Sequence, residues 1–483
     1  MVDEASPERQ GSLPDGEGFG GLLAECVETA RAAVASLHPR RLAVGLLAVL
    51  LLGQIGDLHD RLAGPRFGPG GLLAEDPEAE LVASIERWRS RLSESIASEA
   101  DSGSFDAESA TPWQLLAEGR RRLVASRSSR IDDDADLGGE ARVEMERVFL
   151  EDRPLGTYDA VSSLVAGRFG DFCRSVVAID PRSAATSLGG MVIDVPVAVW
   201  RHDRLFLLSF GLPALIVSTL LGGMVARMAA CRFARRQWLT LGESADFVGA
   251  SWRRLISAPL LPLAAALVPL GAVALLGLVL SVPWLDVVAG VLFGSSLILG
   301  LLAGILLVGI AVGWPLIVPA VACEDADAAD CLQRAYAYPF NRFGRYLVLA
   351  VAAIVGLAVA VAVLDALLLT TLWSVRLAVA GTAPAWVGEL LDGRGWLEFG
   401  APSPAMLSID GVAADAVATW VSLSRLLVGA LVFAWLFDAG VRIHLFLRRA
   451  VDRVRPEEIA ESPGQRPRAE RVREAIEAAR RAS

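Results

Sequence analysis

The tetrapeptide His-Asp-Arg-Leu occurs twice in this sequence and carries side chains that could bind a metal ion. One copy supplies His59 and Asp60, and the other supplies His202 and Asp203. Imidazole nitrogens and carboxylate oxygens are common ligands of zinc, so four such groups that meet in space form a metal site. The alternative is two polar motifs at helix ends that make salt bridges. We expect the salt bridges, and neither a metal nor another cofactor.

Charged residues within apolar segments form a second candidate set. Asp438 and Arg442 are four residues apart, the spacing at which helical side chains meet. Asp365 lies toward the end of one apolar segment and Arg425 at the start of the next, so these two could also pair. Intramembrane charges mark ion or proton pathways or, more commonly, pair to fix helix positions. We expect pairing.

Three Gly-xxx-Gly pairs lie in one apolar segment. They are Gly290 and Gly294, Gly300 and Gly304, and Gly309 and Gly313. Glycines four residues apart leave a stripe of bare backbone against which another helix can pack closely. We expect packing within the chain; the alternatives are dimerisation and a lipid-facing stripe without a role.

The segment 330–346 combines arginine with aromatic residues. This composition suits a segment at the lipid headgroups, where guanidinium groups meet anionic phosphates. The simplest interpretation is interfacial anchoring, and the alternative is a specific lipid or partner site. The candidate headgroup ligands are Arg334, Tyr336, Tyr338, Arg342, Arg345 and Tyr346.

No catalytic motif accompanies these residues. The sequence lacks GxxxxGK[ST], HExxH, GxSxG and a GxGxxG in a suitable context. All 45 basic residues are arginine, and the net charge of -10 argues against nucleic-acid binding, which needs a basic surface. Arginine in place of lysine is typical of a GC-rich bacterial genome. We expect no catalytic residues.

Long uncharged blocks must position these side chains. The chain is 54% hydrophobic, and a helix needs roughly 20 apolar residues to cross a bilayer. The uncharged block 289–322 corresponds to about 51 Å of helix, too long for one crossing and too short for two. We therefore expect one tilted span that breaks at 313–315. The predicted spans are 41–58, 205–226, 260–282, 289–315, 346–373 and 426–446.

Arginine placement orients these six spans. Segment 227–258 contains six arginines and two acidic residues, and segment 448–483 is also rich in arginine. Because cytoplasmic loops collect positive charge, we expect both termini in the cytoplasm of a bacterial inner membrane. Residues 1–40 are then a cytoplasmic leader, helical over 21–37, and 448–483 are a cytoplasmic tail.

The segment 59–204 is the one large region outside the membrane in this topology. Apolar residues recur at helical spacing over 78–97, 113–126, 140–150 and 158–177. Strand-like alternation is nearly absent. The sequence therefore predicts an all-α integral membrane bundle of about six spans, with a five-span membrane domain at 205–447 and a small helical extracytoplasmic domain between spans one and two.

Three stretches carry a resemblance to a known group of proteins. They read LGGMVARMAACRFAR (221–235), SWRRLISAPLLPLAAAL (251–267) and GWPLIVPAVACEDADAADCLQRAYAYPFNRFGRYL (313–347). From about residue 200 onward, the chain resembles an uncharacterised family of multi-pass membrane proteins common in planctomycete bacteria. It is more weakly similar to the membrane domain attached to some glycerophosphodiesterases, but it has no catalytic barrel. The resemblance implies no reaction.

The expected function is a non-enzymatic inner-membrane protein that acts as a scaffold, accessory subunit or envelope-organising protein. Its expected partners are the lipid bilayer, including anionic lipids, and a membrane protein or a second copy of the chain. One alternative is a transporter or channel component with its pathway near Asp365, Arg425, Asp438 and Arg442. Another is a membrane enzyme or binding protein of lipid metabolism that uses the segment 336–346.

Overall fold

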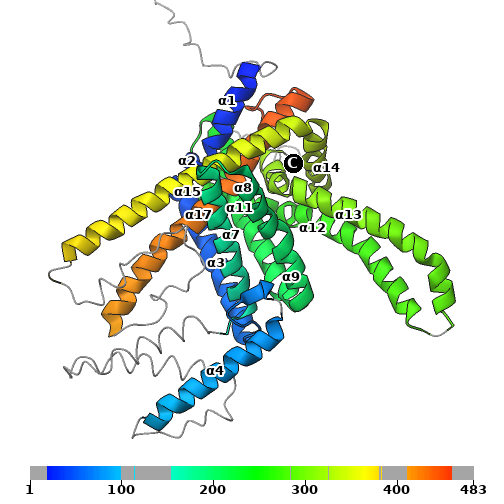
Figure 1. Cartoon of the computed structure of the whole chain (residues 1–483). Coiled ribbons are helices and arrows are strands. Elements are labelled where there is room, and N and C mark those ends of the chain that lie inside the picture. The colour runs from blue at the N-terminus through cyan, green and yellow to red at the C-terminus, as the bar shows by residue number, and fades with distance from the viewer. Residues whose placement is uncertain are drawn as a thin grey trace, which may run out of the picture. The chain divides into compact units, whose positions relative to one another are not determined.

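The computed structural model of the chain is built from α-helices, which confirms the predicted all-α fold class (Figure 1). The structure describes residues 19–98, 154–379 and 411–459 except for 75, 283 and 325, together with the single residues 114 and 382. Within these residues no β-strand forms, and one isolated antiparallel bridge joins Phe67 to Leu155. The predicted helices at 113–126 and 140–150 lie outside the described residues.

Seven of the described helices are long and apolar enough to cross a membrane, so the chain is a multi-pass membrane protein. The additional helix is Pro181–His202, in the segment assigned to the extracytoplasmic domain. Asp194 interrupts its apolar run, so a search for uncharged blocks misses it. The six helices that correspond to predicted spans are Pro39–Ala63, Arg204–Arg235, Leu241–Leu280, Gly290–Ile310, Phe343–Val379 and Leu426–Asp452.

The chain forms two compact units. Unit 1 contains residues 1–48, 216–357 and 430–483, and unit 2 contains residues 49–215 and 358–429. The helices that contribute to unit 1 are α1 (Phe19–Ala30), α2 (Ala32–Ser36), α3 (Pro39–Ala63), α11 (Leu212–Arg235), α12 (Leu241–Leu280), α13 (Asp286–Cys323), α14 (Ala328–Asn341), α15 (Phe343–Val379) and α17 (Gly411–Asp452).

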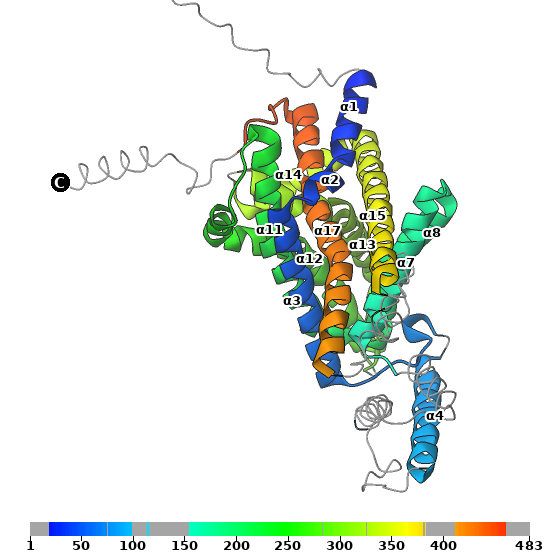
Figure 2. The same cartoon turned by 90° about the vertical axis from the view of Figure 1, so that its left-hand side faces the viewer.

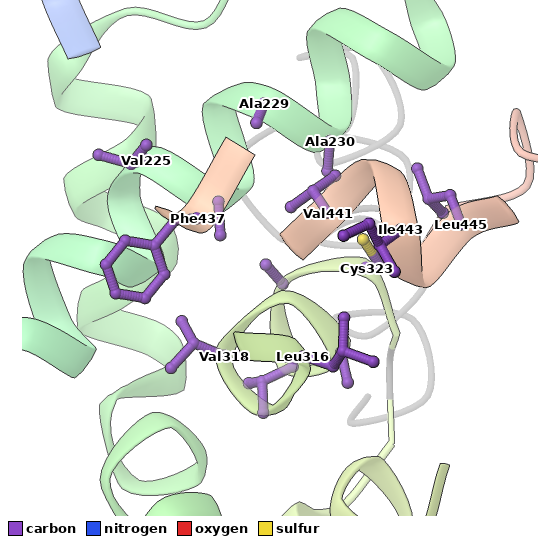
Figure 3. Packing of buried hydrophobic residues seen from close by; sticks show 14 of the residues in the cluster. Val225, Ala229, Ala230, Leu316, Val318, Cys323, Phe437, Val441, Ile443 and Leu445 are labelled. Carbon is purple, nitrogen blue, oxygen red and sulfur yellow. The ribbon is translucent and has the colours of Figure 1, made fainter. Parts of the chain in front are cut away.

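The core of unit 1 forms where α11, α13 and α17 meet (Figure 3). Ala229 and Ala230 of α11 are buried with Leu316 of α13 and Val441 of α17. Small side chains on α11 allow close packing of the helix backbones, which increases dispersion contacts. The leader also contributes, because Ala32 is fully buried in the same cluster. Residues predicted as a cytoplasmic leader are therefore part of the core.

Helices α12 and α13 lie side by side as a long helical hairpin (Figure 1). The break predicted at 313–315 is wrong, because α13 continues through Pro315 and Pro319 to Cys323. A proline in a membrane helix is tolerated where a neighbouring helix packs against the disturbed backbone. Gly440 of α17 supplies this contact, since a Cβ placed there would meet the Pro315 carbonyl oxygen and the Pro319 ring.

Replacement of Gly440 by alanine tests this contact. We expect Gly440→Ala to destabilise the protein by about 1–3 kcal/mol, because the added methyl group overpacks the contact with α13. Thermal unfolding of the purified protein in detergent measures the change. Gly344→Ala is the control, because a Cβ at Gly344 meets no atom within 4 Å among the described residues. Equal melting temperatures for the two variants would contradict the close contact.

The six paired glycines differ in how closely other atoms of the chain approach them. A Cβ at Gly313 would lie 2.8 Å from the Tyr336 ring, and one at Gly309 would lie 3.4 Å from it. A Cβ at any of the other four would meet no described atom within 4 Å; these glycines are Gly290, Gly294, Gly300 and Gly304. Packing within the chain is therefore found for one Gly-xxx-Gly pair of the three, as far as the described residues extend.

Unit 2 is built around a second helical hairpin. Its chain includes the 3-10 turn η1 (Gly71–Leu73), α4 (Pro77–Ser98) and α7 (Thr157–Val177), which match the helices predicted over 78–97 and 158–177. After a turn in which Ile179 has a φ of 57°, the chain returns through α8 (Pro181–Gly189), the π-helix η4 (Gly190–Asp194) and α9 (Val195–His202). Figure 2 shows α8 beside the end of α7.

This hairpin begins and ends at the same place in unit 2. Asp60, near the end of α3, accepts hydrogen bonds from the backbone N–H groups of Tyr158 and Asp159 at the start of α7, at 2.8 and 3.0 Å. Asp203, directly after α9, contacts His59 of α3. The start of α7 and the residue after α9 therefore both lie beside the end of α3.

Candidate functional site

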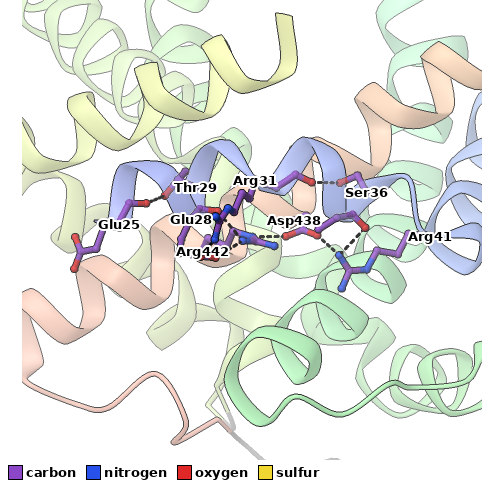
Figure 4. A network of polar contacts seen from close by, with 10 residues as sticks. Glu25, Glu28, Thr29, Arg31, Ser36, Arg41, Asp438 and Arg442 are labelled. Carbon is purple, nitrogen blue, oxygen red and sulfur yellow. Dashed lines mark hydrogen bonds and ion pairs between the residues drawn. The ribbon is translucent and has the colours of Figure 1, made fainter. Parts of the chain in front are cut away.

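Four charged residues of unit 1, three of them buried, form one cluster, which we call the charge cluster: Glu28, Arg41, Asp438 and Arg442 (Figure 4). The Asp438 carboxylate binds the Arg442 guanidinium, with Nε to Oδ1 at 2.8 Å, and also binds Arg41. Arg442 Nη1 donates to the Glu28 backbone oxygen at 2.6 Å and lies 3.4 Å from the Glu28 carboxylate. The pair expected at 438 and 442 is thus present within a larger network.

The charge cluster is electrically balanced, with two guanidinium groups and two carboxylates. Asp438 is 1% exposed and Arg41 is 2% exposed, so neither charge is solvated by bulk water. Arg41 also donates to the backbone oxygens of Ala35 and Met228, both at 3.3 Å. Buried ions keep their charge when such partners replace their hydration. The arrangement holds α2, α3, α11 and α17 together.

A second ion pair attaches the leader helix. Arg345 of α15 binds the Glu25 carboxylate through two nitrogens, with Nε to Oε2 at 3.0 Å. Burial raises the pKa of Glu25, and the hydrogen bond and charge of Arg345 act in the opposite direction. Close packing accompanies the pair, because a Cβ at Gly356 of α15 would contact the Ala30 backbone of α1. The leader is therefore fixed to unit 1 by charge and by packing.

A third group of charges surrounds Glu324, the residue directly after α13; we call it the Glu324 cluster: Glu324, Arg334, His444 and Arg448. The Glu324 carboxylate lies 3.1 Å from His444 Nε2, binds Arg334 and lies 3.9 Å from Arg448 Nε. His444 is fully buried. This histidine is a core residue that orients the carboxylate.

Two of the three candidate headgroup arginines form ion pairs within unit 1. Arg334 binds Glu324, and Arg345 binds Glu25, so their charges are compensated by carboxylates of the chain. Arg342 is exposed. A guanidinium paired with a carboxylate has lost most of its attraction for a lipid phosphate. Of these three arginines, Arg342 alone is exposed and without such a pair in the described part of unit 1.

The candidate headgroup tyrosines are also used in packing. Tyr338 binds the Asp452 carboxylate, and burial together with this hydrogen bond raises its pKa. The Tyr346 hydroxyl donates to the Val312 backbone oxygen at 2.8 Å. Tyr336 lies against Gly313. The segment fixes α14 and α15 to α13 and α17 rather than presenting these tyrosines at a surface.

Two further charged residues, Arg227 of unit 1 and Asp365 of unit 2, are also buried. Arg227, at the end of the predicted second span, is fully buried; it donates to the Ala322 backbone oxygen at 2.8 Å and lies 5.0 Å above the Phe247 ring. Asp365 is 5% exposed in unit 2. The side chain of Arg425 lies outside the described residues, so the pair of Asp365 with Arg425 stays a prediction.

The two His-Asp-Arg-Leu copies do meet in unit 2, at a group we call the junction: His59, Asp60, Arg66, Thr157, Asp203 and Ser209. Asp203 accepts from Thr157 at 2.8 Å, from the Phe206 backbone N–H at 3.2 Å and from Arg66 at 2.9 Å. Its carboxylate also lies 3.3 Å from His59 Nε2. Both aspartate carboxylates of the repeated motif therefore already accept hydrogen bonds. Asp60 accepts them from the start of α7, and Asp203 accepts one from α10 (Arg204–Phe206).

This geometry disfavours the metal interpretation. His202 points to the Phe67 ring, with ring centroids 6.1 Å apart, while His59 contacts Asp203. Across the described residues, no group of three or more His, Cys, Asp or Glu side chains could hold a metal. The purified protein is expected to contain no stoichiometric zinc and to keep its melting temperature in a chelator. Elemental analysis after mild purification checks this, and a 1:1 metal content would contradict it.

Comparison with known proteins adds no functional assignment to this geometry. No family model, no curated protein and no solved structure matches the chain.

Proposed function

We propose that the chain is a structural protein of a bacterial inner membrane, a scaffold or accessory subunit with both termini in the cytoplasm. The observation that carries this proposal is the charge cluster. Its four charges compensate one another and join segments far apart in the sequence, namely the leader helices and α17. A transport pathway requires groups that exchange partners with an ion or water during the cycle. Charges held by one another favour a fixed arrangement.

The second support is the apolar surface of the helical hairpin α12–α13. Val291 is 81% exposed and Ile298 is 71% exposed, and neither is covered by unit 1. In a membrane this surface contacts lipid or another membrane protein, because apolar side chains leave water in either case. A scaffold or accessory subunit uses part of such a surface to hold its partner.

Photo-crosslinking in living cells tests the proposal. A photo-reactive amino acid at position 291 or 298 is expected to yield a discrete protein adduct, whereas the same group at Ile317, which is 1% exposed, yields none. Adducts with lipid alone at both exposed positions would contradict a scaffold. A proton or ion flux in proteoliposomes that Asp438→Asn abolishes would also contradict it, and would favour the transporter instead.

A further inference from the structure

The junction of unit 2 contains a chain of three side chains in contact, two of which, His59 and Asp203, come from the repeated tetrapeptide. Ser209 Oγ lies 2.7 Å from His59 Nδ1, and His59 Nε2 lies 3.3 Å from Asp203 Oδ2. A serine hydroxyl, an imidazole and a carboxylate connected in this order are the parts of a nucleophilic serine site. Compared with the serine proteases, the two ring nitrogens exchange roles: Nδ1 faces the serine and Nε2 faces the carboxylate.

The direction of these hydrogen bonds follows from the partners of Asp203. An ionised carboxylate only accepts hydrogen bonds, and Asp203 is paired with the Arg66 guanidinium at 2.9 Å. Nε2 of His59 must therefore carry the proton, which leaves the lone pair of Nδ1 directed at Ser209. The Leu205 backbone oxygen, 2.9 Å from Ser209 Oγ, competes for the hydroxyl proton. When the proton points to Nδ1, the serine is poised for activation by the imidazole.

Exposure and backbone geometry distinguish Ser209 from an ordinary core serine. His59 is 7% exposed and Asp203 is 2% exposed, whereas Ser209 is exposed. The serine lies in the middle of the π-helix η5 (Leu207–Gly211), and single turns of π-helix occur frequently at functional sites. A buried base and orienting acid beneath an accessible hydroxyl is the arrangement that a nucleophile requires.

We propose that Ser209 is the nucleophile of an acyl-transfer site that hydrolyses acyl esters of anionic membrane lipids. Ser209 Oγ forms a bond to the ester carbonyl carbon as its proton passes to His59 Nδ1. The bond from that carbon to the alcohol oxygen then breaks, and the alcohol leaves with the proton from His59. A water molecule attacks the acyl-serine, His59 takes its proton and returns it to Ser209, and a fatty acid is released. Asp203 stabilises the protonated imidazole in both halves.

The surface around Ser209 identifies the class of substrate. Three neighbouring side chains, Leu205, Leu208 and Leu212, are 65%, 67% and 42% exposed, so an acyl chain that reaches the serine meets an apolar surface. Ser209 lies five residues after Arg204, about 8 Å along the helix, which is the depth of the boundary between headgroups and acyl chains.

Basic groups lie at the headgroup end of the same surface. Arg201 and Arg204 are exposed, and the Arg204 guanidinium lies 5.4 Å from the Trp200 ring centroid. Asp203, which lies between them in the sequence, is paired with Arg66. Within the described part of the chain neither guanidinium forms an ion pair, and two such groups at the interface favour a phosphate-bearing anionic headgroup. This activity goes beyond the scaffold role proposed above, and the two can fail independently.

Labelling of the full-length protein with a fluorophosphonate probe tests the nucleophile. The wild-type protein in mild detergent is expected to be labelled, Ser209→Ala to lose the label, and His59→Gln to be labelled about 100-fold more slowly. Ser374→Ala is the matched control, because Ser374 is an exposed serine of unit 2 with the same hydrogen bond to the backbone oxygen four residues earlier. Melting temperatures establish that the variants fold. Equal labelling of wild type and Ser209→Ala would overturn the proposal.

Fatty-acid release from mixed micelles tests the substrate class. Micelles that contain phosphatidylglycerol are expected to yield fatty acid at least tenfold faster than micelles of phosphatidylcholine, and Ser209→Ala is expected to abolish the release. The double variant Arg201→Gln/Arg204→Gln is expected to reduce this preference while the fluorophosphonate still labels Ser209. Labelling of Ser209 without fatty-acid release from either lipid would overturn the assignment to lipid esters.

Discussion

The Asp438→Asn variant is expected to lose about 3–5 kcal/mol of stability, the range for removal of one partner from a buried ion pair. Asparagine fits the space but carries no charge, so the Arg41 guanidinium, which is 2% exposed, remains buried without an ionic partner. Arg442 would retain the Glu28 carboxylate. Thermal unfolding and limited proteolysis of the purified protein in detergent measure the effect.

Two further variants make this prediction specific. Asp57→Asn removes a carboxylate from an exposed pair with Arg61, so its effect is expected to stay below about 1 kcal/mol. The double variant Arg41→Met/Asp438→Leu replaces the buried pair by apolar groups and is expected to regain most of the loss. If Asp438→Asn were as stable as the wild type, the charge cluster would not hold the helices together.

The Glu324→Gln variant is expected to show the second-largest effect, a loss of about 2–3 kcal/mol at neutral pH. Burial alone would raise the pKa of Glu324, but the hydrogen bond to His444 and the charges of Arg334 and Arg448 lower it below its ordinary value of 4.5. The ionised carboxylate therefore stabilises the fold above pH 4.5, and this contribution is lost as the pH falls through the lower value. The wild-type protein should lose stability in acid.

The pH dependence of the melting temperature distinguishes the buried Glu324 carboxylate from exposed carboxylates. Melting temperatures measured from pH 3 to pH 7 should fall toward low pH in the wild type, and the difference from Glu324→Gln should shrink in the same range. Glu86→Gln is the control, because the Glu86 side chain is 68% exposed in its pair with Arg89. A difference between wild type and Glu324→Gln that stays constant down to pH 3 would contradict the lowered pKa of Glu324, because it requires equal pKa values in the folded and unfolded states.

The fold could be predicted largely from uncharged blocks of sequence. Such blocks locate membrane helices because lipid excludes charge, and six of the seven apolar helices were found in this way. Pro181–His202 was missed because Asp194 interrupts it, and its pairing with α7 depends on contacts that no local pattern reports. The break predicted at Pro315 failed because packing against Gly440 supports the helix there.

The sites were predictable only where partners lie close in sequence. Asp438 and Arg442 are one helical turn apart, so their pair could be expected. Arg41 is 397 residues from Asp438. Its position at the start of the first predicted span gave no indication of this partner. Arg334 and Arg345 were predicted to bind lipid headgroups because no local pattern in the sequence indicates their carboxylate partners, Glu324 and Glu25.

The repeated tetrapeptide identified residues that meet, and Asp203 makes the kind of salt bridge expected from it. His59 and Asp203 do lie together, as a metal site would require. The sequence could not show that Arg66, Thr157 and the Phe206 backbone already occupy Asp203, or that Ser209 reaches the other nitrogen of His59. No motif joins the three residues, because each comes from a different part of the chain.

The membrane arrangement can be tested directly by labelling single cysteines in intact cells, in a variant from which the five native cysteines have been removed. Glu78→Cys lies on α4 after the first span, and Gly242→Cys lies in the first turn of α12 after Arg204–Arg235; both positions are exposed. A membrane-impermeant maleimide should label position 78 in intact cells and position 242 only after lysis. Labelling of both positions in intact cells, or of position 242 alone, would contradict the arrangement.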